Sequence, residues 1–252
     1  MSKMIGKSFL ITLFVIGVMY ALRQVVGTDI FFTKTGFVFG SLMTGIGALY
    51  GMMSAFIVFQ VWNKYNKTSE LIDQEALGLE QLSNLTLHFR DHKLSLKMNE
   101  AIKNYANLVV ESKLKTFIGG ERQVKIESAF HKIGEIIKDI KFDDDHDAII
   151  FGNVISQYQK LSELRSQRLN QNTTHLPPLL KVFLYIGSII LISLFISVPF
   201  SNIIHNALAI GGLTFIVSII IQLVEDLDDP IGGHWSLSPA PFERMIKQIR
   251  TD

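Results

Sequence analysis

The sequence predicts an all-α integral membrane protein with four transmembrane helices and a helical cytoplasmic insert between helices two and three. Two uncharged runs lead to this prediction: 29 consecutive residues from Thr35 to Asn63 and 43 from Val182 to Val224 contain no Asp, Glu, Lys or Arg. Since about 20 apolar residues cross a bilayer as a helix, the first run holds one crossing and the second holds two. Charged residues make up only 19% of the 252 residues, against about 25% in soluble domains, which excludes an ordinary soluble enzyme.

A further crossing is expected near the N-terminus, where the apolar stretch from Ser8 to Leu22 lies between Lys7 and Arg23. Its 15 residues also match the length of a signal-peptide core. The two flanking cations can extend toward lipid headgroups, and apolar neighbours lengthen the stretch at both ends. No clear small-residue cleavage site follows it, so the sequence favours a retained membrane helix.

The other three membrane helices are bounded by aromatic residues, proline and charge. Helix two is expected from about Gly36 to Trp62, because tryptophan favours the interface between lipid and water. Helix three is expected from about Leu179 to Val198, where Pro199 ends it, and helix four from about Ala207 to Glu225. These limits divide the chain into an N-terminal transmembrane helix pair (1–62), a cytoplasmic helical domain (63–178), a C-terminal transmembrane helix pair (179–225) and an acidic turn with an amphipathic cytoplasmic tail (226–252).

The predicted cytoplasmic domain is helical by its periodicity. Apolar residues recur every three or four positions in four stripes, over 71–89, 94–109, 124–140 and 150–164, and no strand alternation is present. The region is evenly charged, with 16 basic and 16 acidic residues. Pro177 and Pro178 end it just before helix three.

The short loops place most of their cations on one side of the membrane. That side carries the N-terminal lysines, the cations at both ends of the insert and those of the tail, whereas the other side carries Arg23 and Lys34. Because Lys and Arg are enriched in cytoplasmic loops, we expect both termini and the insert to be cytoplasmic. The chain is therefore expected to lie in the cell (inner) membrane as a multi-pass protein.

Helix two separates its side chains by size. At 100° per residue, the small residues fall on an arc of about 140°, and large apolar residues occupy the opposite arc. Contact with lipid does not explain this separation. A small-residue face either packs closely against another helix or lines a pore with little side-chain bulk. The candidate residues for pore lining or helix packing on this helix are Gly40, Thr44, Gly47, Gly51 and Ser54.

Helix four carries a polar stripe that contains Thr214, Ser218 and Gln222 and ends at Glu225. Their spacing keeps all four on one face of the helix. Polar groups in a membrane helix face protein or water, so the stripe serves either hydrogen bonding between helices or a hydrated path.

An acidic turn follows, with Asp226, Asp228 and Asp229 at the C-terminal end of helix four. These carboxylates oppose the helix dipole, so they need compensation from a basic neighbour or a bound metal. Oxygen ligands of this kind suit Ca²⁺ or Mg²⁺, and the three aspartates are possible calcium ligands, with Ca²⁺ as the possible cofactor. In the tail, Phe242, Met245, Ile246 and Ile249 share one helix face, which either lies at the inner leaflet or packs against the cytoplasmic domain.

Several function classes are excluded by what the sequence lacks. It has no cysteine, nucleophile elbow, P-loop or paired catalytic carboxylates, so an enzyme is not expected. The net charge of +1 gives no basic excess for nucleic acid. The expected partners are the lipid bilayer, further copies of the chain in a homo-oligomer, and a small permeant ion.

The segment DLDDPIGGHWSLSPAPFERM, residues 226–245, resembles the C-terminal signature of the bestrophin-like domain family of bacterial multi-pass membrane proteins. Ile231 stands where that family usually has Phe. Two further stretches resemble the family, Glu75 to Gly78 and Arg165 to Pro178. The residues that match the signature are Leu227, Asp228, Pro230, Gly233, Ser238, Pro239 and Phe242.

The resemblance implies distant kinship with bestrophins, which are multimeric anion channels with four membrane helices per subunit, cytoplasmic termini and an acidic Ca²⁺-binding segment after the last membrane helix. By this resemblance we expect an oligomeric ion channel with helix two lining the path. The alternative is a non-conducting membrane scaffold or signalling protein that recruits a partner through its cytoplasmic domain.

Overall fold

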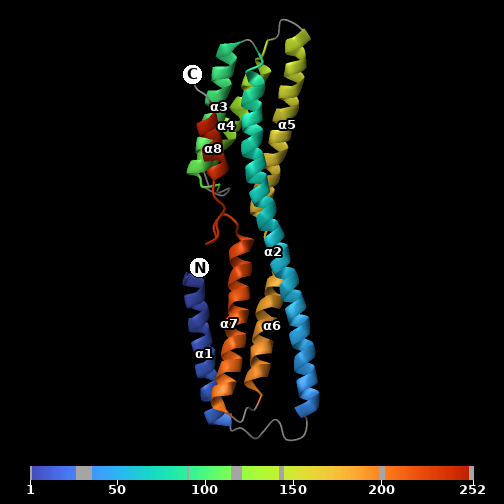
Figure 1. The fold of residues 1–252 in the computed structure, drawn as a ribbon, viewed down its shortest axis with the longest axis vertical. Helices are drawn as coiled ribbons and strands as arrows, with labels where there is room; N and C mark the ends of the chain where they lie inside the picture. The colour runs from blue at the N-terminus through green and yellow to red at the C-terminus, as the bar shows by residue number, and fades with distance from the viewer. Residues whose placement is uncertain are drawn as a thin grey trace. The chain divides into compact units, whose positions relative to one another are not determined.

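The computed structural model describes residues 2–26, 36–89, 91–114, 121–141, 145–198 and 202–249. Over these ranges the chain is all-α, with no strand, which confirms the predicted fold class. Figure 1 shows the helices, which are α1 (Ser2–Val26), α2 (Gly36–Thr86), α3 (His92–Glu111), α4 (Glu121–Lys138), α5 (Asp145–Thr173), α6 (Pro178–Ile196), α7 (Ile203–Asp228) and α8 (Ala240–Gln248).

Four stretches of the described residues are long and apolar enough to cross a membrane. They lie on α1, on α2, on α6 together with the preceding α5, and on α7, so the predicted number of membrane spans is confirmed. Large apolar side chains on these helices are widely exposed within one chain, for example Phe14 at 72% and Leu208 at 68%. Such surfaces are stable only against lipid or further protein.

Two membrane helices extend further than the sequence predicts. Helix α2 does not end near Trp62 but continues to Thr86, so the second predicted crossing and the first apolar stripe of the insert form one helix of 51 residues. Polar residues replace apolar ones after position 62 without a proline, and a change of polarity alone does not end a helix. Helix α7 reaches Asp228, which places Asp226 and Asp228 inside its last turn.

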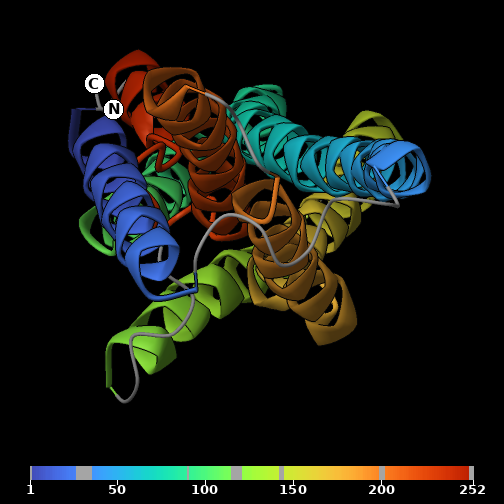
Figure 2. The same cartoon turned by 90° about the horizontal axis from the view of Figure 1, so that it is seen from below.

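The chain divides into two compact units, Met1–Asn63 with Leu176–Asp228, and Lys64–His175 with Asp229–Asp252. In the first unit, α1 lies along α7 over much of its length, and α6 also packs on α7 (Figures 1 and 2). The described side chains of α1 that this packing buries are Ser8, Thr12 and Met19, while most of the other α1 side chains are exposed.

The second unit is built around α3, which packs against α4 and α8. Its core contains most residues of the predicted stripes, with Leu79, Ile102 and Ile133 fully buried. Val124, which the α4 stripe also included, is 67% exposed and lies outside this core.

The C-terminal tail forms α8, whose apolar face is covered by protein. Phe242, Met245 and Ile249 are 0%, 2% and 6% exposed and belong to the core of the second unit. Of the two interpretations of the tail, packing against the helical unit is therefore the observed one.

Candidate functional site

Helix α2 packs within the single chain through a narrow seam. Tyr50, Ser54 and Ile57 are 5%, 3% and 0% exposed and follow one another at helical spacing. The Tyr50 hydroxyl lies 2.6 Å from Ser188 Oγ on α6. At Gly187 an added Cβ would lie 2.8 Å from the Tyr50 ring, so this close approach requires glycine. The seam thus joins α2 to α6 through contacts that tolerate little extra volume.

The rest of the small-residue face of α2 is uncovered within one chain. Gly40, Thr44 and Gly51 are exposed, and a Cβ added at Gly40 or Gly51 would meet no atom within 4 Å. At Gly47, in contrast, a Cβ would lie 3.8 Å from Leu191 Cδ1 of α6. Gly47 and Ser54 therefore take part in packing within the chain, whereas Gly40, Thr44 and Gly51 form an open strip of small residues.

The polar stripe of α7 faces α1. A Cβ added at Gly211 would lie 3.2 Å from Ile16 Cδ1 and 3.5 Å from Thr12 Cγ2, so the two helices approach closely there. Thr214 is 1% exposed and Ser218 is 5% exposed.

Further along the same stripe, the Gln222 amide donates to Ser8 Oγ of α1 at 2.6 Å and to Ser218 Oγ at 3.2 Å. These contacts are those of hydrogen bonding and packing between helices. Glu225 lies apart from them and accepts a hydrogen bond from the Tyr185 hydroxyl on α6.

Asp228 joins the end of α7 to the beginning of α6. Its side chain is 3% exposed, and its carboxylate binds Lys181 Nζ at 2.6 Å and accepts a hydrogen bond from the Leu176 amide at 2.7 Å. Pro177, which precedes α6, gives that helix no side-chain cap. Asp228 therefore places a negative charge at the positive end of α6, and Lys181 balances it.

Asp229 has a different role, because its carboxylate orders the following turn. It accepts a hydrogen bond from the Gly232 amide at 2.8 Å, and a Cβ at Gly232 would collide with it. Over the part of the chain that the structure describes, no three His, Asp or Glu side chains come together as metal ligands. Calcium binding by Asp226, Asp228 and Asp229 stays a prediction, and Lys181 is the basic neighbour that could replace a metal.

The other residues of the sequence signature build the passage from α7 to α8. Leu227 is fully buried, and the Pro230 carbonyl accepts a hydrogen bond from the Leu237 amide at 2.8 Å. The Gly233 amide donates to the Asp229 carbonyl at 2.9 Å. Ser238 Oγ accepts from the Ala240 amide, Pro239 precedes α8, and Phe242 is fully buried.

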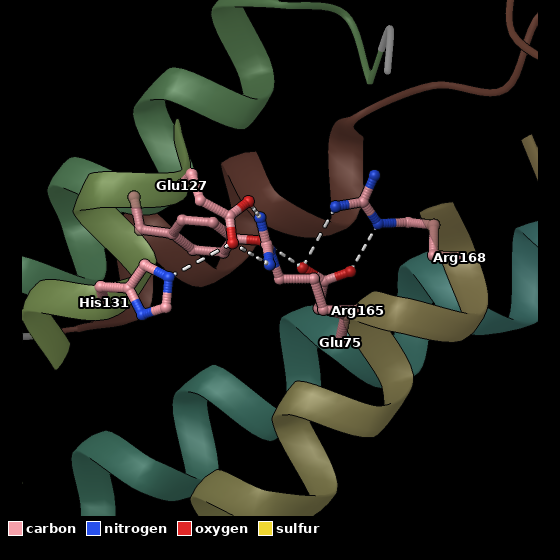
Figure 3. A network of polar contacts seen from close by, with 6 residues as sticks. Glu75, Glu127, His131, Arg165 and Arg168 are labelled. Carbon is pink, nitrogen blue, oxygen red and sulfur yellow. Dashed lines mark hydrogen bonds and ion pairs between the residues drawn. The ribbon is translucent and has the colours of Figure 1, made fainter. Parts of the chain in front are cut away.

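A buried polar network lies in the second unit, with its main members on α2, α3 and α5 (Figure 3). The Glu75 carboxylate binds Arg168 Nε at 2.5 Å and accepts a hydrogen bond from the Tyr105 hydroxyl at 2.5 Å. All three side chains are almost completely buried. Burial, together with the neighbouring Glu75 carboxylate, raises the pKa of Tyr105, so its hydroxyl keeps the proton that it donates.

A second ion pair lies beside this network. Arg165 Nη2 of α5 is 2.6 Å from a Glu127 oxygen of α4 (Figure 3). The Arg165 guanidinium also lies 4.7 Å from the centre of the Phe130 ring. Hydrogen bonds from Arg165 lower the pKa of Glu127, and the nearby His131 adds to the effect. The two arginines thus connect α5 to both α2 and α4.

These two ion pairs are not among the features that the sequence predicts. One signal was present, since Glu75 lies inside the apolar stripe that runs from Leu71 to Leu82, where a buried carboxylate requires a partner. Nothing in the sequence alone indicates that the partner is Arg168, which is 93 positions away.

Comparison with known proteins identifies the fold and the family. The bestrophin-like domain model matches residues 9–242. A bacterial bestrophin homolog from Klebsiella pneumoniae is similar in structure, with a TM-score of 0.68 and 13% identity over 98% of this chain and 94% of the other. A variant of that homolog gives a TM-score of 0.71 and 12% identity over 98% of this chain and 96% of the other.

No protein with a curated description matches the sequence. At 12–13% identity the solved structures show that the fold is shared. The family assignment follows from the match to the domain model, which extends over most of α1 and continues through α7 into α8. The chain belongs to the bestrophin-like domain family.

Proposed function

We propose that the protein is a subunit of an oligomeric ion channel of the cytoplasmic membrane, with α2 lining the ion path. The observation that supports this most directly is the strip formed by Gly40, Thr44 and Gly51, which one chain leaves uncovered. Membership of the bestrophin-like family supports it independently, since the resemblance to bestrophins implies an oligomeric ion channel.

The two exposed faces of α2 suit different surroundings. Leu42, Leu49 and Met52 are 58%, 63% and 63% exposed, and such large apolar side chains suit lipid. The small-residue strip offers lipid little contact, but it allows the backbone of a neighbouring subunit, or a hydrated ion, to approach closely. The assembly therefore places the small-residue strip toward its own interior.

The proposal includes the orientation of the chain across the membrane. Lys and Arg favour the cytoplasmic side, so residues 64–175 and both termini lie inside the cell.

The test is ion flux through liposomes that contain the purified protein. Gly51→Leu places a bulky side chain on the open strip, and Leu49→Ala is the matched control on the large-residue face. We expect a concentration gradient of a permeant anion or cation to dissipate through the wild type and Leu49→Ala, and much more slowly through Gly51→Leu.

Assembly is measured on the same samples by size-exclusion chromatography with light scattering. A wild-type oligomer that conducts no small ion would contradict the channel and favour a non-conducting scaffold. Equal flux through all three proteins would show that the open strip does not line the path.

A further inference from the structure

A row of hydroxyl groups lies at the contact between α1 and α7 in the first unit. Ser8 and Thr12 of α1 are 0% and 8% exposed, and Thr214 and Ser218 of α7 are 1% and 5% exposed. Both helices carry candidate membrane spans. A polar group buried in a membrane helix can form hydrogen bonds only with protein or with a bound molecule, so each hydroxyl of the row needs such a partner.

Within this row, Thr214 is the residue whose hydroxyl has no partner. Its Oγ1 atom is buried and forms no hydrogen bond over the ranges that the structure describes. Hydroxyls in helices often donate to the carbonyl four residues earlier, as Thr12 and Thr44 do at 2.8 and 2.9 Å. Thr214 does not use the Ile210 carbonyl in this way, so its hydroxyl is available to a further molecule.

Two neighbouring hydroxyls also have a hydrogen left to donate. Ser8 Oγ and Ser218 Oγ accept hydrogen bonds from the Gln222 amide at 2.6 and 3.2 Å, and within the described ranges neither hydroxyl donates one. Thr214 lies one turn of α7 before Ser218 and on the same face. Three hydroxyls of the row can therefore donate to a molecule that accepts hydrogen bonds.

Contacts between the two helices close this stretch at both ends. At Gly211 an added Cβ would lie 3.2 Å from Ile16 Cδ1, which leaves little space between the helices there. At the other end the Gln222 side chain reaches across to Ser8. No Asp, Glu, Lys or Arg occurs in residues 8–16 or 211–222. A narrow, uncharged and polar site of this kind fits water and excludes an ion or a larger molecule.

We propose that the contact between α1 and α7 binds water at Thr214, Ser218 and Ser8. A buried water typically forms about three hydrogen bonds, and these three hydroxyls supply that number. The bound water completes the hydrogen bonding between two membrane helices and so helps to hold α1 on α7. The site is independent of ion conduction, because it includes no residue of the open strip of α2.

The first test is solid-state NMR of the full-length protein in phosphatidylcholine bilayers, with transfer of magnetisation from water to side chains. A water contact is expected at Thr214. Ser188 is the matched control, because it is 4% exposed and its hydroxyl donates to the Leu184 carbonyl at 2.6 Å, so no water contact is expected there. The absence of a contact at Thr214, or an equal contact at Ser188, would overturn the proposal.

Substitutions at Thr214 then test whether its hydroxyl binds the water. Thr214→Val removes the hydroxyl with little change of shape, so it should abolish the water contact and lower Tm by about 2–4 °C, the effect of one lost hydrogen bond in a chain of this size. Thr214→Ser keeps the hydroxyl and should keep the water contact.

The direction of the Tm change separates bound water from an unsatisfied hydroxyl. A buried hydroxyl that bonds to nothing destabilises the fold, so its removal in Thr214→Val would leave Tm unchanged or raise it. Either of these results, or a water contact that persists beside Val at this position, would contradict the proposed site. The comparison of Thr214 with Ser188 in the wild type depends on no variant.

Discussion

Glu75 and Arg168 form an ion pair of 2.5 Å in which the two side chains are only 0% and 3% exposed. They lie on α2 and α5, so the pair connects two helices that are distant in sequence. Moving charged groups out of water is energetically costly, because they lose their hydrogen bonds to water. The hydrogen bond from Tyr105 to Glu75 replaces part of that lost hydration. This pair also gives a physical reason for the family resemblance at Glu75 and Arg168.

Breaking the Glu75–Arg168 pair from one side should destabilise the helical unit severely. Arg168→Met leaves the Glu75 carboxylate buried without its cation, which typically costs about 3–5 kcal/mol. Thermal unfolding in detergent measures the loss. Lys132→Met, in an exposed pair on α4, is the control and should change Tm little. Similar Tm losses in both variants would show that burial does not decide the strength of these pairs.

The contribution of Glu127 to the stability of the fold should depend on pH. Arg165 lowers the pKa of Glu127 below its ordinary value of 4.5. A carboxyl with a lowered folded-state pKa stabilises the fold above its unfolded pKa and loses that contribution as the pH falls through the folded value. The Tm difference between the wild type and Glu127→Gln should therefore be present at pH 7 and shrink below about pH 4.5. A difference that stays constant down to pH 3 would argue against this linkage.

Gly187→Ala should loosen the contact between α6 and α2. The added methyl group would lie 2.8 Å from the Tyr50 ring, which packing holds in place. Overpacking of this kind costs about 1–3 kcal/mol, measured as a loss of Tm. Gly212→Ala on α7 is the matched control, because a Cβ there meets nothing within 4 Å. If both variants unfold at the wild-type temperature, α2 can move away from α6 without cost.

Asp228→Asn should lower Tm, because Lys181 loses the carboxylate that lies 2.6 Å from it. The calcium hypothesis adds a second expectation for the wild type, a Ca²⁺-specific rise of Tm that Mg²⁺ does not give and that Asp228→Asn removes. At a hundredfold excess over its dissociation constant, a ligand stabilises by about 2.7 kcal/mol. If chelator leaves the wild-type Tm unchanged, Lys181 alone balances the aspartate.

The proposed topology can be tested with single cysteines, since the native sequence has none. A cysteine at Asn107, exposed on α3, should resist an impermeant thiol reagent in intact cells, whereas one at Asn202, exposed just before α7, should react. Labelling at Asn107 from outside would reverse the orientation inferred from the positive charges.

The membrane helices could be predicted from the sequence because their signal is local. Uncharged runs and apolar periodicity predict each crossing and each stripe from neighbouring residues alone. The continuation of α2 beyond Trp62 was not predicted, because the change from apolar to polar residues resembles a boundary although the backbone continues as a helix.

The candidate site was harder to predict, because its contacts join distant positions. The small residues of α2 were recognised as one face, but only the structure separates Gly47, which packs near Leu191, from the open Gly40 and Gly51. Asp228 was identified as an acid in need of compensation, and its partner Lys181 lies 47 positions earlier on another helix. Such pairs depend on how the helices pack, which no local pattern encodes.

The two prolines at the beginning of α6 make it possible to follow how the contact between α6 and the end of α7 opens. Pro177 and Pro178 carry no amide hydrogen, so a peptide that spans the junction contains few exchangeable amides. Among them, the Leu176 amide donates to the Asp228 carboxylate. Its rate of deuterium uptake therefore reports directly how often the end of α7 separates from the start of α6.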